Sequence, residues 1–104
     1  MKYQSIETYF DKALKDPAEA VMFLNAVIDE RDVDALLLAL AHVARAHGIT
    51  MIAKRSGLQR EAIYKMLRNK ANPEFRSIVK VLAASGLQLA IKEARPIVGQ
   101  KMAA

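Results

Sequence analysis

The residues best suited to chemistry in this sequence lie in one stretch, SGLQREAIYKMLRNK, residues 56–70. Apolar residues recur there every three or four positions, and polar or charged residues fill the gaps between them. The polar set is Arg60, Glu61, Tyr64, Lys65 and Arg68. This spacing predicts an amphipathic helix with one buried face and one mainly basic face. Such a face contacts only water in many proteins, but its guanidinium, amide and carboxylate groups are also those that hydrogen-bond to base edges.

Two helices and a turn are expected to position that face. Ala53, Gly57 and Ile63 have the spacing of a helix–turn–helix: a small residue at the helix crossing, a glycine in the turn and an apolar plug. Glycine adopts a positive φ without steric penalty, which suits Gly57 to the turn. Thr50 is predicted to be the N-cap of the first helix. The local core is completed by Ile52, Leu58, Met66 and Leu67.

The second helix of such a motif enters the major groove, and its N-terminal residues reach the base edges. Arg60 suits guanine, Gln59 suits adenine, and Glu61 suits the amino group of cytosine. The residues predicted to read bases are Gln59, Arg60, Glu61, Tyr64 and Lys65. Contacts to phosphates set the register and carry most of the salt-dependent affinity. The residues predicted to make them are Thr50, Lys54, Arg68, Asn69 and Lys70.

The charge distribution favours a polyanionic partner for the second half of the chain. The 104 residues carry a formal net charge of +5. Residues 1–48 contain five Lys/Arg and eight Asp/Glu, a net charge of −3, whereas residues 49–104 contain eleven Lys/Arg and three Glu, a net charge of +8. A basic half that includes the motif favours double-stranded DNA. RNA is disfavoured because the sequence has neither a glycine-rich basic loop nor an aromatic pair for base stacking.

The sequence lacks the residues of several other function classes. Cysteine is absent, which excludes disulfides, zinc–thiolate sites and a cysteine nucleophile, and is compatible with a cytoplasmic location. His42 and His47 lie five positions apart, about 140° around a helix, so they do not share a metal-facing side. The acidic residues between positions 29 and 34 lack the spacing and glycine of an EF-hand, and a helix-capping loop is the simpler interpretation.

No catalytic role is predicted. No nucleophile motif and no phosphate-binding glycine loop is present, so we expect neither an enzyme nor a cofactor or metal site. The N-terminal residues lack the apolar segment of a signal peptide. No uncharged run approaches the roughly 20 apolar residues that a membrane helix needs, so no membrane association is expected.

Helix boundaries are marked by a few residues. Asp16 followed by Pro17 predicts one helix start, and Asp32 predicts another. Gly48 and Gly86 predict helix ends. The apolar run between the second start and Gly48 predicts a buried central helix. In the last helix, the residues predicted to face the core are Phe75, Ile78, Val79 and Leu82.

These boundaries predict an all-α fold of about five to six helices with one short C-terminal β-strand. A single DNA-binding domain is expected over residues 1–92. It comprises N-terminal helices over 5–31, a core over 32–86 and a strand over 87–92, and a flexible tail follows over 93–104.

The strand follows from a change of period after Gly86. Leu87, Leu89 and Ile91 alternate with Gln, Ala and Lys, and such alternation is typical of a strand. An isolated strand needs a partner for its open edge. Two copies that pair antiparallel across a two-fold axis would supply it, so these three residues are predicted to mediate dimerisation. Pairing with N-terminal residues of the same chain is the alternative.

Two stretches cover roughly residues 16 to 91: DPAEAVMFLNAVIDERDVDALLLALAHVARAHGIT and IAKRSGLQREAIYKMLRNKANPEFRSIVKVLAASGLQLAI. They resemble the probable addiction module antidote proteins, antitoxins with a lambda-repressor-like helix–turn–helix of the Xre type. The resemblance implies a homodimer that represses a shared, palindromic operator, and a RelE-like ribonuclease toxin as partner. Members usually have Ser or Thr where this chain has Gln59, which is a poorer N-cap.

The leading hypothesis is therefore a sequence-specific DNA-binding repressor that is also the antitoxin of a type II toxin–antitoxin module. One alternative is a toxin-neutralising interaction module without specific DNA binding, and another is a stand-alone Xre-type regulator without a toxin. The acidic first half either serves as scaffold or covers a basic toxin surface. In the second case the rim consists of Asp11, Asp29, Glu30 and Asp32.

Overall fold

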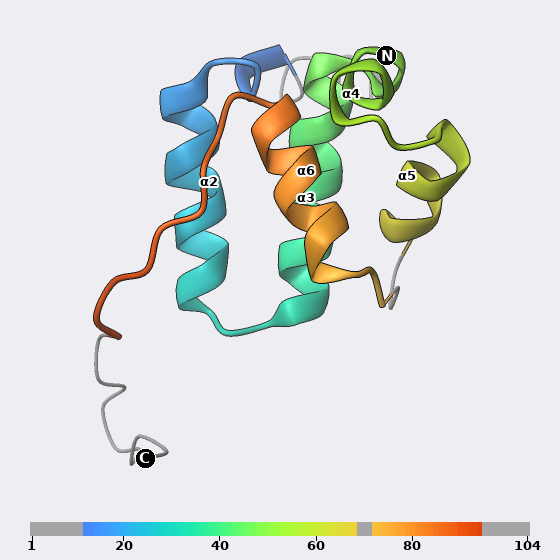
Figure 1. The fold of residues 1–104 in the computed structure, drawn as a ribbon. Coiled ribbons are helices and arrows are strands. Elements are labelled where there is room, and N and C mark those ends of the chain that lie inside the picture. The colour runs from blue at the N-terminus through green and yellow to red at the C-terminus, as the bar shows by residue number, and fades with distance from the viewer. Residues whose placement is uncertain (1–11, 69–71, 95–104) are drawn as a thin grey trace, which may run out of the picture.

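A computed structural model describes residues 12–68 and 72–94 of the chain. The described residues form the following α-helices (Figure 1): α2 (Pro17–Asp29), α3 (Val33–His47), α4 (Ile49–Ser56), α5 (Arg60–Met66) and α6 (Phe75–Ala84). Lys12 and Ala13 are also helical and Leu14 and Lys15 form a turn, whereas the part of the predicted first helix before residue 12 lies outside the described residues. The part of the chain that is described contains no strand, and the all-α class is confirmed.

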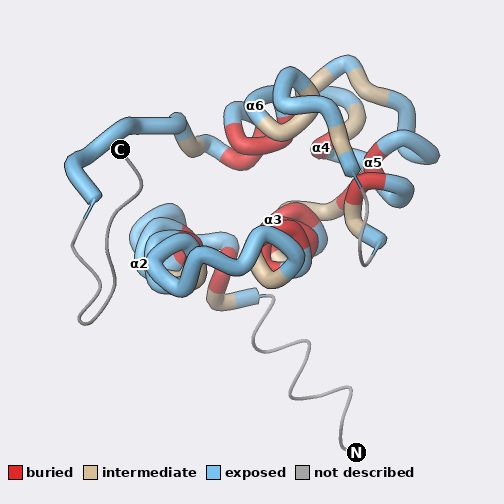
Figure 2. Tube along the Cα trace, turned by 90° about the horizontal axis from the view of Figure 1, so that it is seen from below, coloured by how far each residue is buried: buried red, intermediate tan, exposed pale blue. Residues whose placement is uncertain are grey.

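The central helix α3 organises the core. α2 packs on α3, and α4 packs against α3, α5 and α6, so that buried positions gather where the helices face one another (Figure 2). α3 is buried along much of its length, as its apolar sequence predicts, although Leu38 is half exposed. Each buried aliphatic side chain stabilises the fold by about 1.5–3 kcal/mol. The largest fully buried side chains are Val43, Ile52, Ile63 and Val81.

The predicted N-caps of α2 and α3 are confirmed. An Asp16 carboxylate oxygen accepts a hydrogen bond from the Ala18 N–H at 3.1 Å, and an Asp32 oxygen accepts one from the Ala35 N–H at 3.1 Å. Both bonds satisfy N–H groups that the first helical turn cannot pair internally. Pro17 follows Asp16 in the first turn of α2, where its missing N–H has no consequence.

Gly48 joins α3 to α4 as a single residue. Its φ of 94° ends α3, and its N–H donates to the Ala44 carbonyl at 3.0 Å. The two helices meet there at an angle of 97°. Among the described residues, no single helix is long and apolar enough to cross a membrane, and only α3 and α4 taken together reach that length and composition across their bend.

The prediction that Thr50 caps α4 is wrong. Because Gly48 alone separates the two helices, α4 begins at Ile49 and Thr50 lies within its first turn. The N-cap is Gly48, which makes no side-chain capping bond. Thr50 is exposed, so its hydroxyl remains at the surface.

The predicted core face of α6 is partly wrong. Phe75 is 69% exposed and Val79 is 39% exposed, whereas Val81 and Ser85 are buried. α6 is apolar on two overlapping sides, and its packing against α4 selects between them. The Ser85 hydroxyl is accommodated there because it donates to the Val81 carbonyl at 2.9 Å.

The predicted strand over residues 87–92 is not present, because residues 87–94, the described part of the chain that follows Gly86, contain neither helix nor strand. Strand formation needs a neighbour for the backbone groups, and the described residues provide none. α6 instead ends in a Schellman motif: the Leu87 N–H donates to the Leu82 carbonyl at 2.8 Å, and the Gly86 N–H donates to the Ala83 carbonyl at 3.0 Å. The half-buried Leu87 packs against the core as part of this motif.

Candidate nucleic-acid interface

α5 has one buried and one exposed face, as predicted. Ile63 is 0% exposed and Met66 is 4% exposed, so both side chains belong to the core. The helix lies at one edge of the molecule, with α4 beside it (Figure 1). The residues predicted to read bases are all exposed: Gln59, Arg60, Glu61, Tyr64 and Lys65.

The turn before α5 is held by Gly57 and Ser56. Gly57 adopts a left-handed conformation with a φ of 78°, and its N–H donates to the Ala53 carbonyl at 3.0 Å. The Ser56 hydroxyl accepts a hydrogen bond from the Leu58 N–H at 3.1 Å. Ser56 was given no predicted role, although a serine beside a turn glycine commonly bonds to nearby backbone groups. Both bonds fix the position from which α5 starts.

Gln59 is the N-cap of α5. Its backbone is extended, with a φ of −76° and a ψ of 148°, and its side chain makes no capping hydrogen bond. The side chain is also exposed. Its amide is therefore not used to start the helix and can bind a ligand beside the first turn of α5.

Arg60 and Tyr64 lie one turn apart on the exposed face of α5. The Arg60 guanidinium donates to the Tyr64 hydroxyl at 3.5 Å, at the long limit for a hydrogen bond. The contact brings together two of the side chains that are predicted to read bases.

The residues predicted to contact phosphate are only partly described. Thr50, Lys54 and Arg68 are exposed, whereas Asn69 and Lys70 lie outside the described residues. Arg68 and Lys65 also line a surface hollow of about 660 Å³ between α5 and the start of α6.

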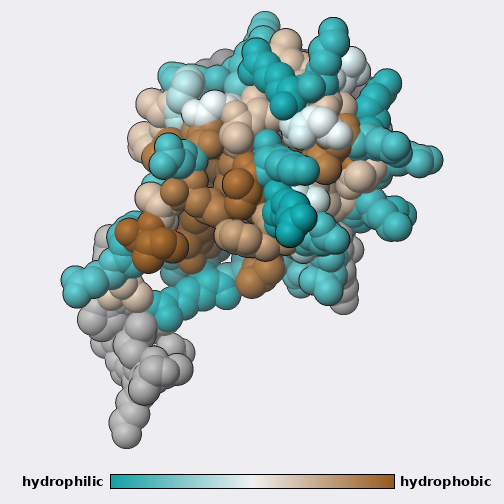
Figure 3. Space-filling view, viewed as in Figure 1, coloured by the Kyte–Doolittle hydropathy of each residue, from teal (hydrophilic) through white to brown (hydrophobic). Residues whose placement is uncertain are grey.

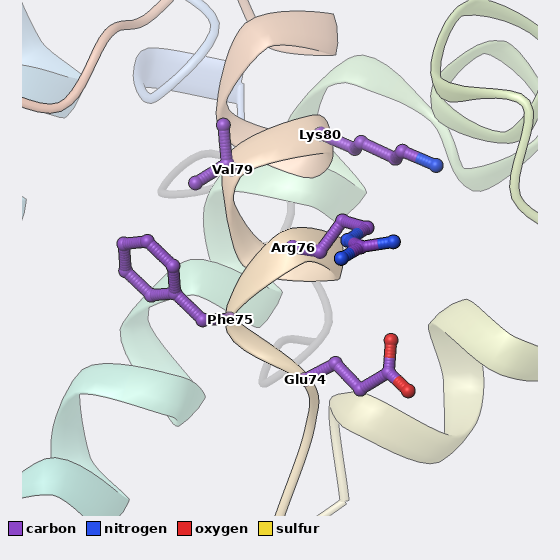
Figure 4. Close-up of a pocket in the computed structure, with 5 residues that line it drawn as sticks. All are labelled: Glu74, Phe75, Arg76, Val79 and Lys80. Atoms are coloured by element: carbon purple, nitrogen blue, oxygen red, sulfur yellow. The ribbon is translucent and has the colours of Figure 1, made fainter.

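α6 adds two basic residues that the sequence analysis did not assign. Arg76 and Lys80 lie one helical turn apart and point toward the side of α5, whereas Phe75 and Val79 point the other way (Figure 4). Together with Glu74, these four residues line a shallow hollow of about 710 Å³. The four-residue spacing of Arg76 and Lys80 was the feature of the sequence that indicated two basic side chains on one side of this helix.

Arg55 has a structural role. Its guanidinium donates to the Ala84 carbonyl at 3.1 Å and so links α4 to the last turn of α6. Carbonyls at a helix C-terminus have no partner within the helix, and a cation there is favourable. The bond fixes the first helix of the candidate interface on the core.

The end of α3 contains a histidine whose protonation opposes folding. Burial lowers the pKa of His47 below its usual 6.5, and the positive charges of Arg55 and Lys15 lower it further. In the unfolded chain His47 therefore binds a proton at a higher pH than in the folded chain. The stability that depends on neutral His47 is complete above pH 6.5 and is lost as the pH falls toward the folded pKa.

We expect His47→Gln to reduce this pH dependence. The measurement is the thermal midpoint by circular dichroism over about pH 5 to 8, the range in which histidine titrates. Wild-type protein should lose more stability below pH 6.5 than the variant. Equal losses in both proteins would show that His47 does not control stability in this range.

Described residues elsewhere form no metal site: no three His, Asp or Glu side chains among them are arranged to hold an ion.

Comparison with known proteins adds three findings. A family model described as "Probable addiction module antidote protein" matches residues 5–93. The chain is 35% identical over 88 residues to an uncharacterized protein of Haemophilus influenzae (strain ATCC 51907 / DSM 11121 / KW20 / Rd), covering 83% of this chain and 91% of that protein. No solved structure matches the chain significantly.

Proposed function

The chain belongs to the family of probable addiction module antidote proteins, and from this premise we propose that it is both an antitoxin and a sequence-specific repressor of its own operator. The family implies a toxin as partner. In this proposal the toxin is a RelE-like ribonuclease, and α4 and α5 form a lambda-repressor-like helix–turn–helix of the Xre type. The exposed polar face of α5 carries the proposal, because its opposite face is fixed in the core.

α5 enters the major groove in this proposal. The groove is about 12 Å wide and accepts one α-helix. Arg60 lies in the first turn of α5, from which a helix–turn–helix reaches base edges. Gln59 is beside it with an amide that takes no part in capping. The base-reading set is that predicted from the sequence: Gln59, Arg60, Glu61, Tyr64 and Lys65.

Basic residues around α5 bind the DNA backbone in this proposal. The described residues from 49 onward include eight Lys/Arg and three Glu. Lys54 and Arg68 are exposed next to α5, and Arg76 and Lys80 extend the basic surface along α6. Asn69 and Lys70 retain the role predicted from the sequence, as does Thr50. Such contacts bind any sequence and position the reading helix.

A homodimer completes the proposed repressor. Leu89 is 42% exposed and Ile91 is 97% exposed on the extended segment after α6, so both have free surface for a second copy. Antiparallel pairing of two such segments would provide the missing strand partner. Leu87 packs against its own core, which leaves it less surface for this role. A two-fold dimer predicts a palindromic operator with half-sites about one helical turn apart.

The test is a titration of the chain against the DNA upstream of its own gene, with random DNA of equal length as control. We expect tighter binding to the upstream DNA. Six to ten phosphate contacts would lower the affinity by about 10³–10⁵ between about 50 and 200 mM salt. Equal affinity for both DNAs at every salt concentration would contradict the repressor proposal and favour a toxin-neutralising module that does not read DNA.

A further inference from the structure

The outer face of α2 is unusually apolar for a helix on the surface. Such a helix normally points charged residues to solvent. In α2, Met22 is 68% exposed, Val21 is 45% exposed and Ile28 is 42% exposed. Small uncharged residues lie exposed on the same face: Ala18, Asn25 and Ala26. The opposite face packs in the core through Ala20 and Leu24, so the exposed apolar residues are not needed to join α2 to the core.

The charges within residues 16–30, which span α2 and its two caps, are all negative, and one cation flanks them on each side, Lys15 and Arg31. Residues 16–30 contain four acidic residues and no Lys or Arg: Asp16, Glu19, Asp29 and Glu30. An apolar centre with a charged rim is the usual arrangement of a protein–protein interface. The rim repels phosphate groups, so this face does not fit nucleic acid.

The face also lies away from the candidate nucleic-acid interface. α2 and α5 are on opposite sides of the molecule, with α3 and α6 between them (Figures 1 and 2). Hydrophilic side chains crowd the α4–α5 side of the surface (Figure 3). A partner on α2 would therefore leave α5 accessible.

A second copy of this chain is a poor match for the face. In a two-fold dimer the same surface meets itself. Two α2 faces would bring eight carboxylates together, four from each copy, and the flanking Lys15 and Arg31 of the two copies supply only four cations to offset them. Like charges opposed across an interface are unfavourable. A partner with Lys and Arg around an apolar centre fits both properties of the face.

We propose that the outer face of α2 is the docking surface for the toxin, and that the toxin meets it with a basic surface surrounding an apolar pocket for Met22. This inference rests on the proposed antitoxin function. Met22 is central and the most exposed apolar residue of α2. The acidic rim speeds encounter with the basic partner, and the apolar centre supplies the lasting contact.

The probe is the product of the reading frame adjacent to this gene, purified and titrated by calorimetry. Met22→Lys places a cation among the basic groups of the partner and is expected to weaken binding about tenfold or more. Met51→Lys is the matched control on α4, where Met51 is 41% exposed, and it should bind the partner as wild type does. Ala26→Lys is a second test of the same face, because Ala26 is exposed one turn beyond Met22. It should also weaken binding to the partner.

Partner binding that is unchanged in both Met22→Lys and Ala26→Lys would overturn the inference. So would wild-type protein that does not bind the probe, or sedimentation showing that the variants dissociate a homodimer instead. Affinity for the upstream DNA is measured on the same samples and should be unchanged in Met22→Lys. Loss of specific DNA binding in wild type, with partner binding still sensitive to Met22→Lys, would refute the repressor function alone and leave the docking surface in place.

Discussion

Arg60→Ala is expected to weaken binding to the upstream DNA by about 1–3 kcal/mol and to relax the preference at one base pair. Arg60 is exposed in the first turn of α5. Alanine cannot make the bidentate hydrogen bonds to guanine that we propose for Arg60. The measurement is a titration of wild type and variant against operator DNA and against operators changed at single positions. The loss should be concentrated at one position of each half-site.

Lys54→Ala distinguishes base reading from general attraction to DNA. Lys54 is exposed on α4 and is predicted to contact phosphate. Its removal should weaken binding to all sequences alike and lower the salt slope by about one. The base-reading role of Arg60 is wrong if Arg60→Ala shows this same uniform pattern.

Ile63→Ala should produce the largest loss of stability, about 2–5 kcal/mol. Ile63 is 0% exposed and belongs to the core cluster that α3, α4, α5 and α6 share. Truncation removes buried methyl and methylene groups and leaves a cavity that close-packed neighbours fill incompletely. Single domains are stable by only about 5–15 kcal/mol, so this loss is a large part of the total. Urea unfolding followed by circular dichroism measures it.

Two further variants control for this loss. Ile63→Val keeps most of the side chain and should cost about 0.5–1.5 kcal/mol. Lys65→Ala changes an exposed residue on the same helix and should stay within about 0.5 kcal/mol of wild type. If Ile63→Ala costs no more than Lys65→Ala, then Ile63 does not join α5 to the core.

The helix boundaries could be predicted because their causes are local. Asp16 and Asp32 bond to backbone groups two or three residues away, and Gly48 and Gly57 provide positive φ angles. Such signals depend on neighbouring residues and are visible in the sequence. Thr50 was wrongly predicted as the N-cap of α4 because threonine is a common N-cap residue. Gly48 alone separates α3 from α4, so α4 begins at Ile49 and Thr50 lies inside the helix.

The parts that could not be predicted depend on distant residues. The side of α6 that is buried depends on α4, because both sides of the helix are apolar enough to form a core. The Arg55–Ala84 bond joins residues 29 positions apart, and no local pattern indicates it. The exposed face of α5 was predictable because Ile63 and Met66 identify its buried face by helical spacing. Arg76 and Lys80 point toward the side of α5 because of the way α6 packs on α4, which no local pattern indicates.

In the proposed dimer, Gly86 contributes to the spacing of the operator half-sites. Its φ of 81° sets the direction in which the chain leaves α6, and the Leu87–Leu82 bond holds that direction. In the proposed dimer, the two copies of α5 are separated by a distance that this direction fixes. The proposed spacing between half-sites then depends in part on a backbone angle far from any base. In such a dimer, a change at this joint would alter the spacing between half-sites while the reading helix stays the same.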